Sequence, residues 1–193
     1  GVTSATTTNS FGVRLVGVQG VAGASLTDVS INAMGVSQNG ANAYGISLEY
    51  SSGPSAVLLE RVKVSVPSSA NPIALNVSGS SAEVYSSLFT VGSATGLGRT
   101  VAAVSQTLAP SLYLEGNTLE TWNDAAQSGS TTVFYLPNPG ATVAAVSNIF
   151  GAGQANSHKL IDRAIAPTNL TPASWTNNYF WFPRNAAREA ADN

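Results

Sequence analysis

The chain has 193 residues, of which only 9% are charged, and its formal net charge is -2. Soluble domains usually contain about 25% charged residues, so hydroxyl, amide and small apolar side chains must form much of this surface. A near-neutral chain without a Lys/Arg cluster argues against nucleic acid as a partner, and the absence of cysteine excludes disulfides and thiolate metal sites.

Residues 1–10, GVTSATTTNS, are polar and low in complexity. We expect a linker, or the cut edge of a preceding domain, because the chain begins with Gly1 rather than Met and has no signal peptide. No apolar run reaches the roughly 18–20 residues that a membrane helix requires, so no membrane partner is expected.

A first series of short apolar segments begins at residue 11. Each segment alternates apolar with small or polar residues and is bounded by Gly, Pro, Ser or Asn, which is typical of β-strands. The segments are FGVRLVGV (11–18), YGISLEY (44–50), NPIALNVSG (71–79), RTVAAVSQT (99–107) and TTVFYLPNP (131–139). Aligned on Val13, Ile46, Ile73, Val101 and Val133, they are spaced by 33, 27, 28 and 32 residues.

A second series lies between the members of the first. Its segments are SLTDVSI (25–31), LLERVKV (58–64), EVYSSLF (83–89), YLEGNTL (113–119) and AVSNIF (145–150). Aligned on Val29, Val62, Leu88, Thr118 and Ile149, they are spaced by 33, 26, 30 and 31 residues. Because both series drift together around 30 residues, they indicate one structural repeat.

The repeat unit contains two strands and no helical periodicity, so it cannot bury its apolar face alone and must stack on its neighbours. The pattern resembles the right-handed parallel β-helix, the pectate-lyase-like solenoids whose coils follow GI-x-L … V-x-I. This resemblance covers residues 11–153 and implies an all-β, right-handed parallel β-helix of about five coils. An antiparallel β-sandwich, which also has short strands and Gly/Pro turns, is the alternative.

Alternation along the strands predicts which side chains face the interior. The predicted core is Val13, Leu15, Val29, Ile31, Ile46, Leu48, Val62, Val64, Ile73, Leu75, Leu88, Val101, Leu119, Val133 and Ile149. The predicted outward positions include Arg14, Ser47, Ala74 and Ala102 in the first series, and Asp28, Ser30, Arg61, Lys63, Ser87, Asn117 and Asn148 in the second.

Residues 154–193 are expected to form a C-terminal cap or tail. They contain five aromatic residues within eight positions, from Trp175 to Phe182. One interpretation is a plug that folds over the last coil, because aromatic side chains are usually buried. The other is a subunit interface or a sugar-stacking platform, in which Trp175, Tyr179 and Trp181 bind ligand.

The sequence predicts no catalytic residue. A glycosidase needs two carboxylates about 5–10 Å apart, and neither outward series places such a pair on neighbouring coils. The best local cluster is LEGNTLETWND, which combines Glu115, Glu120, Trp122 and Asp124, the composition of a carbohydrate-binding groove. The alternative is structural: Glu115 at a strand edge and Asn117 in a turn that favours Asn.

No cofactor or metal site is predicted. His158 is the only histidine, and it would approach Asp162, four residues later, only on a helix. No second His or Cys is present for a zinc site.

Two functions follow as hypotheses. The first is a non-catalytic structural or recognition module of a larger extracellular protein, such as a surface adhesin or phage tail fibre, with a polysaccharide as candidate ligand. The second is a polysaccharide lyase or glycoside hydrolase domain. Either would be located outside the cell, on the cell surface or on a virion. Exposed strand edges favour a homo-oligomer or a neighbouring domain, and the resemblance to phage proteins implies a trimer.

Overall fold

The computed structural model of the chain describes residues 9–17, 23–33, 41–50, 56–94, 97–104, 111–122, 130–136, 142–152, 158–163, 175–181 and 188–189. Every element in these ranges is a β-strand, and every pairing between strands is parallel. The prediction of an all-β parallel β-helix is therefore confirmed, and the parallel pairing excludes the β-sandwich.

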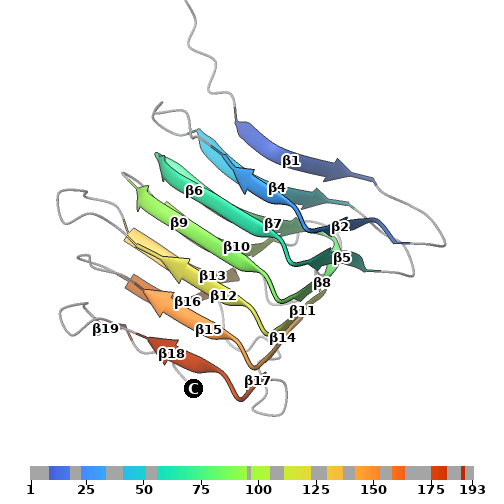
Figure 1. Cartoon of the computed structure of the whole chain (residues 1–193). Helices are drawn as coiled ribbons and strands as arrows, with labels where there is room; N and C mark the ends of the chain where they lie inside the picture. The colour runs from blue at the N-terminus through green and yellow to red at the C-terminus, as the bar shows by residue number, and fades with distance from the viewer. Residues whose placement is uncertain are drawn as a thin grey trace, which may run out of the picture.

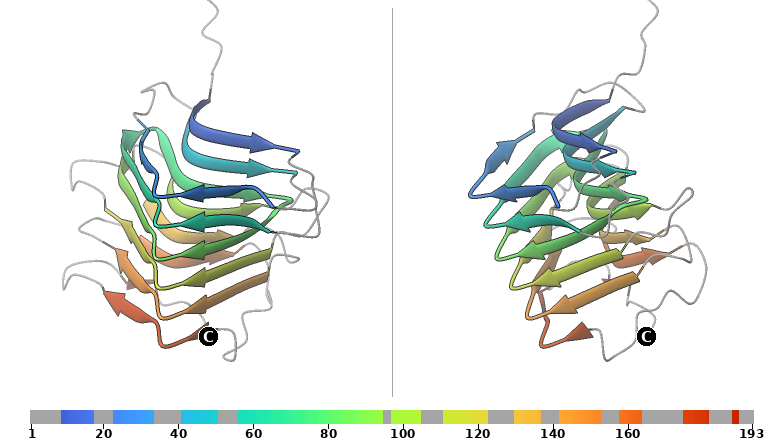
Figure 2. Two further views of the ribbon diagram at one scale, coloured as in Figure 1. Left: turned by 45° about the vertical axis from the view of Figure 1, so that its right-hand side comes forward. Right: turned by 90° about the vertical axis from the view of Figure 1, so that its right-hand side faces the viewer.

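The strands recur in threes, and each member of a group joins a different sheet (Figure 1). Sheet A contains β1 (Ser10–Val16), β4 (Asn42–Glu49), β7 (Asn71–Ser78), β10 (Leu97–Val104), β13 (Ser130–Leu136), β16 (His158–Arg163) and β19 (Arg188–Glu189). Sheet B contains β2 (Ser25–Thr27), β5 (Val57–Glu60), β8 (Ser81–Tyr85), β11 (Ser111–Glu115), β14 (Thr142–Val146) and β17 (Trp175–Thr176). Sheet C contains β3 (Ser30–Asn32), β6 (Lys63–Ser69), β9 (Leu88–Ala94), β12 (Thr118–Thr121), β15 (Ile149–Ala152) and β18 (Tyr179–Trp181). Figure 2 shows the resulting rows stacked from the N-terminal to the C-terminal end.

Two features of the predicted coil were wrong. The described sheets contain seven, six and six strands rather than five coils, and each coil has three strands rather than two. The solenoid also continues past residue 153, because β16–β19 extend the same three sheets. The described residues of the predicted cap thus belong to the β-helix.

A sharp corner divides each segment of the second series into a sheet B strand and a sheet C strand. One residue at every corner has positive φ: Asp28, Arg61, Ser86, Gly116, Ser147 and Asn177. Five of these six residues are not glycine, although L residues rarely adopt this conformation. The strain is offset by coil-to-coil hydrogen bonds, because the N–H of each of the first five corner residues donates to a backbone oxygen of the following coil at 3.0 to 3.1 Å. The single left-handed residue turns the chain from one sheet into the next.

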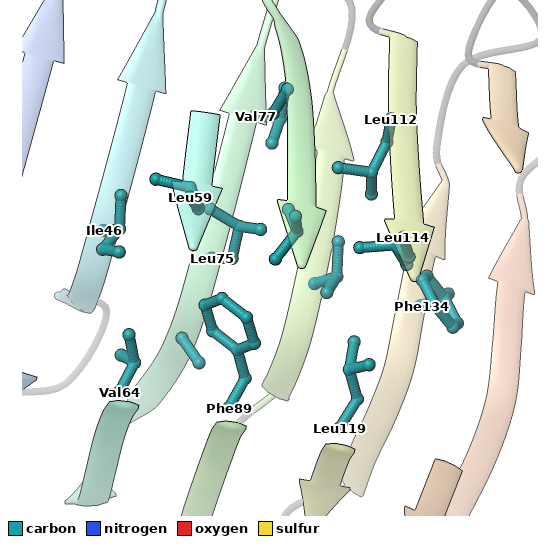
Figure 3. Packing of buried hydrophobic residues seen from close by; sticks show 14 of the residues in the cluster. Ile46, Leu59, Val64, Leu75, Val77, Phe89, Leu112, Leu114, Leu119 and Phe134 are labelled. Atoms are coloured by element: carbon teal, nitrogen blue, oxygen red, sulfur yellow. The ribbon is translucent and has the colours of Figure 1, made fainter. Parts of the chain in front are cut away.

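Apolar side chains from all three sheets fill the interior (Figure 3), and each sheet contributes a long vertical row of them. Sheet A contributes Val13, Ile46, Leu75, Val101 and Phe134. Sheet B contributes Leu26, Leu59, Val84, Leu114, Ala145 and Trp175. Sheet C contributes Ile31, Val64, Phe89, Leu119, Phe150 and Phe180. Equivalent residues of successive coils are register partners, so apolar groups stack directly and exclude water from one continuous core.

The predicted row Val29, Val62, Leu88 is wrong by one residue at its third member. Leu88 pairs with Lys63 on the outer face, and Phe89 takes the interior position beside Val64. Ile149 is likewise 46% exposed, whereas the adjacent Phe150 is fully buried. The corner shifts by one residue the positions that face inward, and the alternation of apolar and polar residues in the sequence does not predict this shift.

Sheet A also departs from strict alternation. Ala74 and Leu75 both join the core, so the predicted outward position of Ala74 is wrong, and Ile46 pairs with Leu75 rather than Ile73. Ser47 is fully buried, although it was predicted to face outward. The structure places Ala102 in a strand but does not describe its side chain, so its predicted outward position stays a prediction.

The predicted outward positions Ser87, Asn117 and Asn148 are also wrong, because the residue after each corner points inward and is buried. The side-chain oxygen of Asn148 accepts the backbone N–H of Asn117 at 2.9 Å and its side-chain N–H at 3.0 Å. Asn178 accepts the same two groups of Asn148 at the same distances. Ser87 donates its backbone N–H to Asn117 at 2.8 Å. These residues form the asparagine ladder, which joins successive corners.

Replacing Asn148 with alanine should lower the free energy of unfolding by about 2–3 kcal/mol, because it removes the acceptor of the buried Asn117 backbone N–H and a donor to the Leu114 carbonyl. Urea denaturation measures this change. Asn32→Ala, the same substitution at an exposed strand position, is the matched control and should change stability by less than about 0.5 kcal/mol. Equal effects of the two variants would contradict the role of the ladder.

The corrected register makes a second prediction about neighbouring residues. Phe150→Ala should destabilise the fold by about 3–5 kcal/mol, because it opens a cavity in the buried core. Ile149→Ala should cost about 0.5 kcal/mol, since this side chain is on the surface. Thermal unfolding of both variants measures the contrast, and the reverse order would refute the register.

Candidate functional site

The corner at Gly116 divides the predicted cluster in LEGNTLETWND between two faces. Glu115 ends β11 and is exposed on the outer face of sheet B, whereas Glu120 is in β12 on the outer face of sheet C. Asp124 lies outside the described residues. The two glutamates therefore do not form one site, because a single left-handed residue turns the chain between them.

Trp175 belongs to the core rather than to an exposed platform. Its ring contacts Phe134 and Phe150, with centroid distances of 5.3 and 5.7 Å. Its indole N–H donates to the backbone oxygen of Val143 at 3.0 Å. Phe180 adds a further stacked ring, 5.3 Å from Phe150. The predicted plug thus takes the form of aromatic residues in the last interior rows of the solenoid.

Glu120 and Trp181 meet over a glycine on the outer face of sheet C. The register row is Thr90, Glu120, Gly151 and Trp181. A Cβ atom placed on Gly151 would lie 3.5 Å from Trp181 Cε3 and 3.6 Å from Glu120 Cγ. The two side chains therefore lean over Gly151 from the coils on either side, while the Trp181 residue remains 45% exposed.

A second glycine positions Trp122 on the same face. A Cβ atom on Gly92 would overlap the backbone oxygen of Pro67 and lie 2.8 Å from Trp122 Cζ2, so the Pro67 backbone and the indole both occupy space that a side chain at Gly92 would fill. Trp122 is 42% exposed. Ile149 and Tyr179 are register partners on the same face of sheet C, and both are exposed.

We call this surface the aromatic shelf, and its members are Glu120, Trp122, Ile149, Tyr179 and Trp181. Trp122 and Trp181 are two coils apart and two positions apart along the strand, which separates their Cα atoms by about 12 Å. Among the described outward positions of sheet C, the charged residues are Lys63 and Glu120. The shelf thus offers two partly exposed indole rings and one carboxylate on the outer face of sheet C.

The carboxylate on the outer face of sheet A is already bound by the chain itself. Arg14 donates to both oxygens of Glu49 at 3.1 and 2.7 Å. Ser47 donates to Glu49 at 2.8 Å and accepts a hydrogen bond from Asn76 at 2.9 Å. The hydrogen bond from Arg14 is the main reason that the pKa of Glu49 is lowered, although partial burial opposes the shift. This closed network stabilises β1 on β4.

The outer face of sheet B contains carboxylates beside tyrosines and one arginine. Arg61 donates to both oxygens of Asp28 at 2.7 and 2.8 Å and also pairs with Glu60. The tyrosines Tyr85 and Tyr113 donate to Glu83 and Glu115 at 3.2 and 3.0 Å. The pKa of Tyr85 is raised, mainly by desolvation, and that of Tyr113 is raised, mainly by its hydrogen bond to Glu115.

His158 lies in β16, a strand rather than a helix. Four residues along a strand span about 13 Å, so the spacing to Asp162 does not bring these residues together. Within the described ranges, no group of three or more His, Cys, Asp or Glu side chains is placed to hold a metal ion. No helix in the described part of the chain is long and apolar enough to cross a membrane.

Comparison of the chain with protein-family models, curated proteins and solved structures found no match. The function must therefore be argued from the surface itself. Sequence reasoning identified Glu120, Trp122, Tyr179 and Trp181 but missed Gly92 and Gly151. A partial signal exists for Gly92, which is five residues after Ser87 just as Trp122 is five residues after Asn117, whereas Gly151 is three residues after Asn148.

The lowered pKa of Glu49 predicts a pH-dependent contribution to stability. Since the folded pKa is below the ordinary value of 4.5, the contribution is present above about pH 4.5 and is lost as the pH falls through the folded pKa. Urea denaturation at a series of pH values should show a smaller acid-induced loss for Glu49→Gln than for the wild type. An identical pH profile for the two proteins would contradict this coupling.

Proposed function

We propose that this β-helix is a recognition module that binds glycans on the aromatic shelf. The observation that carries the proposal is the exposure of Trp122 and Trp181 on one face, with Glu120 in the coil of Trp122 and Gly151 in the coil between Glu120 and Trp181. Aromatic rings that are exposed on a rigid sheet present flat apolar faces at little cost in entropy. Sugar rings have complementary apolar faces, and their hydroxyl groups can donate hydrogen bonds to a carboxylate.

The two glycines support a rigid platform. Gly92 lets the Trp122 ring lie close to the backbone, and Gly151 does the same for Trp181. Gly92 is in β9 and Gly151 is in β15, and both strands belong to sheet C, whose inner side is packed by the buried residues Phe89, Leu119 and Phe150. Binding would therefore require little reorganisation of the protein, which favours affinity for a weakly contacting ligand such as a glycan.

The shelf favours binding over hydrolysis. A glycosidase needs two carboxylates about 5–10 Å apart, and Glu120 is the one carboxylate among the described members of the shelf. The alternative function, a polysaccharide lyase or glycoside hydrolase, would need a second acidic group from outside the described residues, and Asp124 is the candidate nearest in sequence.

We also propose that the module belongs to a larger extracellular protein of a cell surface or virion, such as an adhesin or phage tail fibre, and that it associates with copies of itself or with a neighbouring domain. The low charge content and the rod-like stacking of strands support this context. Phe180, the last member of the sheet C core row, is 41% exposed, and its coverage by a partner would bury that apolar surface.

Isothermal titration calorimetry against cellulose oligosaccharides, xylan, galactomannan, chitin oligosaccharides and alginate tests the proposal. At least one neutral glycan should bind, and Trp181→Ala and Trp122→Ala should each weaken its Kd by about tenfold, the equivalent of about 1.4 kcal/mol. Tyr113→Ala, which removes a partly exposed ring from sheet B, is the control and should leave this Kd within about twofold.

Absence of binding to every glycan, or equal losses in Trp181→Ala and Tyr113→Ala, would refute the glycan site. Glu120→Gln distinguishes the two functions. If the shelf only binds, this variant should release no fewer reducing ends than the wild type and should bind alginate better, because a charge that repels uronates is removed. Polysaccharide cleavage by the wild type that is lost in Glu120→Gln would establish the alternative.

A further inference from the structure

The outer face of sheet B carries a second patch, which the glycan proposal does not use. Strand β8 presents Glu83 followed by Tyr85, and strand β11 presents Tyr113 followed by Glu115. In the register, Glu83 is beside Tyr113 and Tyr85 is beside Glu115. The two tyrosine rings approach to a centroid distance of 5.8 Å at an angle of 50°. We call these four residues the tyrosine–glutamate square.

The square is the centre of the negative charge of the described surface. With Asp28, Glu60 and Arg61 on the adjoining coils, this face carries four carboxylates and one arginine, a net charge of -3, whereas the whole chain has -2. Arg61 bonds to Asp28 and Glu60. The carboxylates of Glu83 and Glu115 each accept a hydrogen bond from a tyrosine instead, so their charge is not neutralised by those partners.

The corner beside Glu115 lacks the cationic side chain that is present at the corner beside Glu60. Glu60, Tyr85 and Glu115 occupy one register row. The residue after Glu60 is Arg61, whose guanidinium bonds to the carboxylates beside it, while the residue after Glu115 is Gly116. The corner at Gly116 thus has the carboxylate of Glu115 beside it but no side chain that supplies a cation.

The chain shows elsewhere what an aromatic ring next to a glutamate can bind. On sheet A, the guanidinium of Arg14 bonds to both oxygens of Glu49 and lies over the ring of Phe11, 4.9 Å from its centroid. Arg99 lies over the ring of Tyr135 at 3.8 Å. A planar guanidinium suits this combination, because it can pair with a carboxylate and stack on a ring at the same time.

We infer that the tyrosine–glutamate square is a docking surface for an arginine-containing protein segment, which supplies the guanidinium that Gly116 does not. An arginine of the partner would pair with Glu115 or Glu83 and stack on Tyr113 or Tyr85. An extended segment fits best, because alternate side chains of a strand face one way and could follow the two carboxylates across neighbouring coils. The inference does not depend on the glycan proposal, since it concerns a different face.

Fluorescence anisotropy tests the inference with a fluorescein-labelled peptide of about eight residues that carries arginine at alternate positions. The full chain should bind the peptide, and Glu115→Gln should weaken the Kd about tenfold, as expected for a charge-assisted bidentate pair. Glu120→Gln removes the same charge from sheet C and should change the Kd by less than about twofold. Circular dichroism verifies that both variants fold.

Two further peptides and one small cation determine whether the recognition is specific. A peptide with citrulline in place of arginine keeps the shape but lacks the charge and should not bind. A lysine peptide should bind more weakly, because an ammonium cannot pair and stack in the same way. Spermine should compete only weakly if the ligand is a protein segment, and tighter binding of spermine than of the arginine peptide would assign the square to polyamines instead.

Three results would overturn the inference. They are no binding of the arginine peptide at low ionic strength, equal effects of Glu115→Gln and Glu120→Gln, or equal binding of the citrulline peptide. Trp181→Ala should leave peptide binding unchanged and Glu115→Gln should leave glycan binding unchanged, so a failure at one surface can be distinguished from a failure at the other.

Discussion

The structure depends on the hydrogen-bonded corner between sheets B and C. A residue with positive φ turns the chain, and from the corner of Ser87 onward the next residue is polar, points inward and hydrogen-bonds to the corners of neighbouring coils. Buried polar groups are stable only when their hydrogen bonds are satisfied, so each ladder asparagine requires its neighbours at a defined height. The corners therefore set the register of all three sheets, and the apolar rows stack because of that register.

The corner also decides which surface each polar residue joins. Glu115 and Glu120 are five residues apart, yet they belong to different faces, and the register partners of each come from other coils. The aromatic shelf and the tyrosine–glutamate square are consequently built from residues about 30 positions apart in the chain. A parallel solenoid makes this possible because equivalent positions of successive coils are about 4.8 Å apart.

The low charge content gives the few ionised groups clear roles. Arg14 and Arg61 join neighbouring coils through Glu49 and Asp28. These pairs lie at the surface and are screened by solvent, so they contribute less to stability than the buried rows and the asparagine ladder. Among the described side chains, the carboxylates without an arginine are Glu83, Glu115 and Glu120, and these are the ones that the two proposed binding surfaces use.

Hydrophobic alternation and the repeat near 30 residues were sufficient to predict a parallel β-helix, and most of the positions predicted as core are buried, because each coil must bury the same apolar pattern. The spacing of Asn117, Asn148 and Asn178 also repeats near 30, but turn preference gave Asn117 a local role and alternation placed Asn148 on the outside. Only the tertiary structure decided the one-residue shift that buries Phe89 and Phe150. It also separated Glu115 from Glu120 and placed Trp181 beside Gly151. The physical reason is that a single left-handed residue changes the direction of the chain, while the contacts that stabilise it come from the coils on either side.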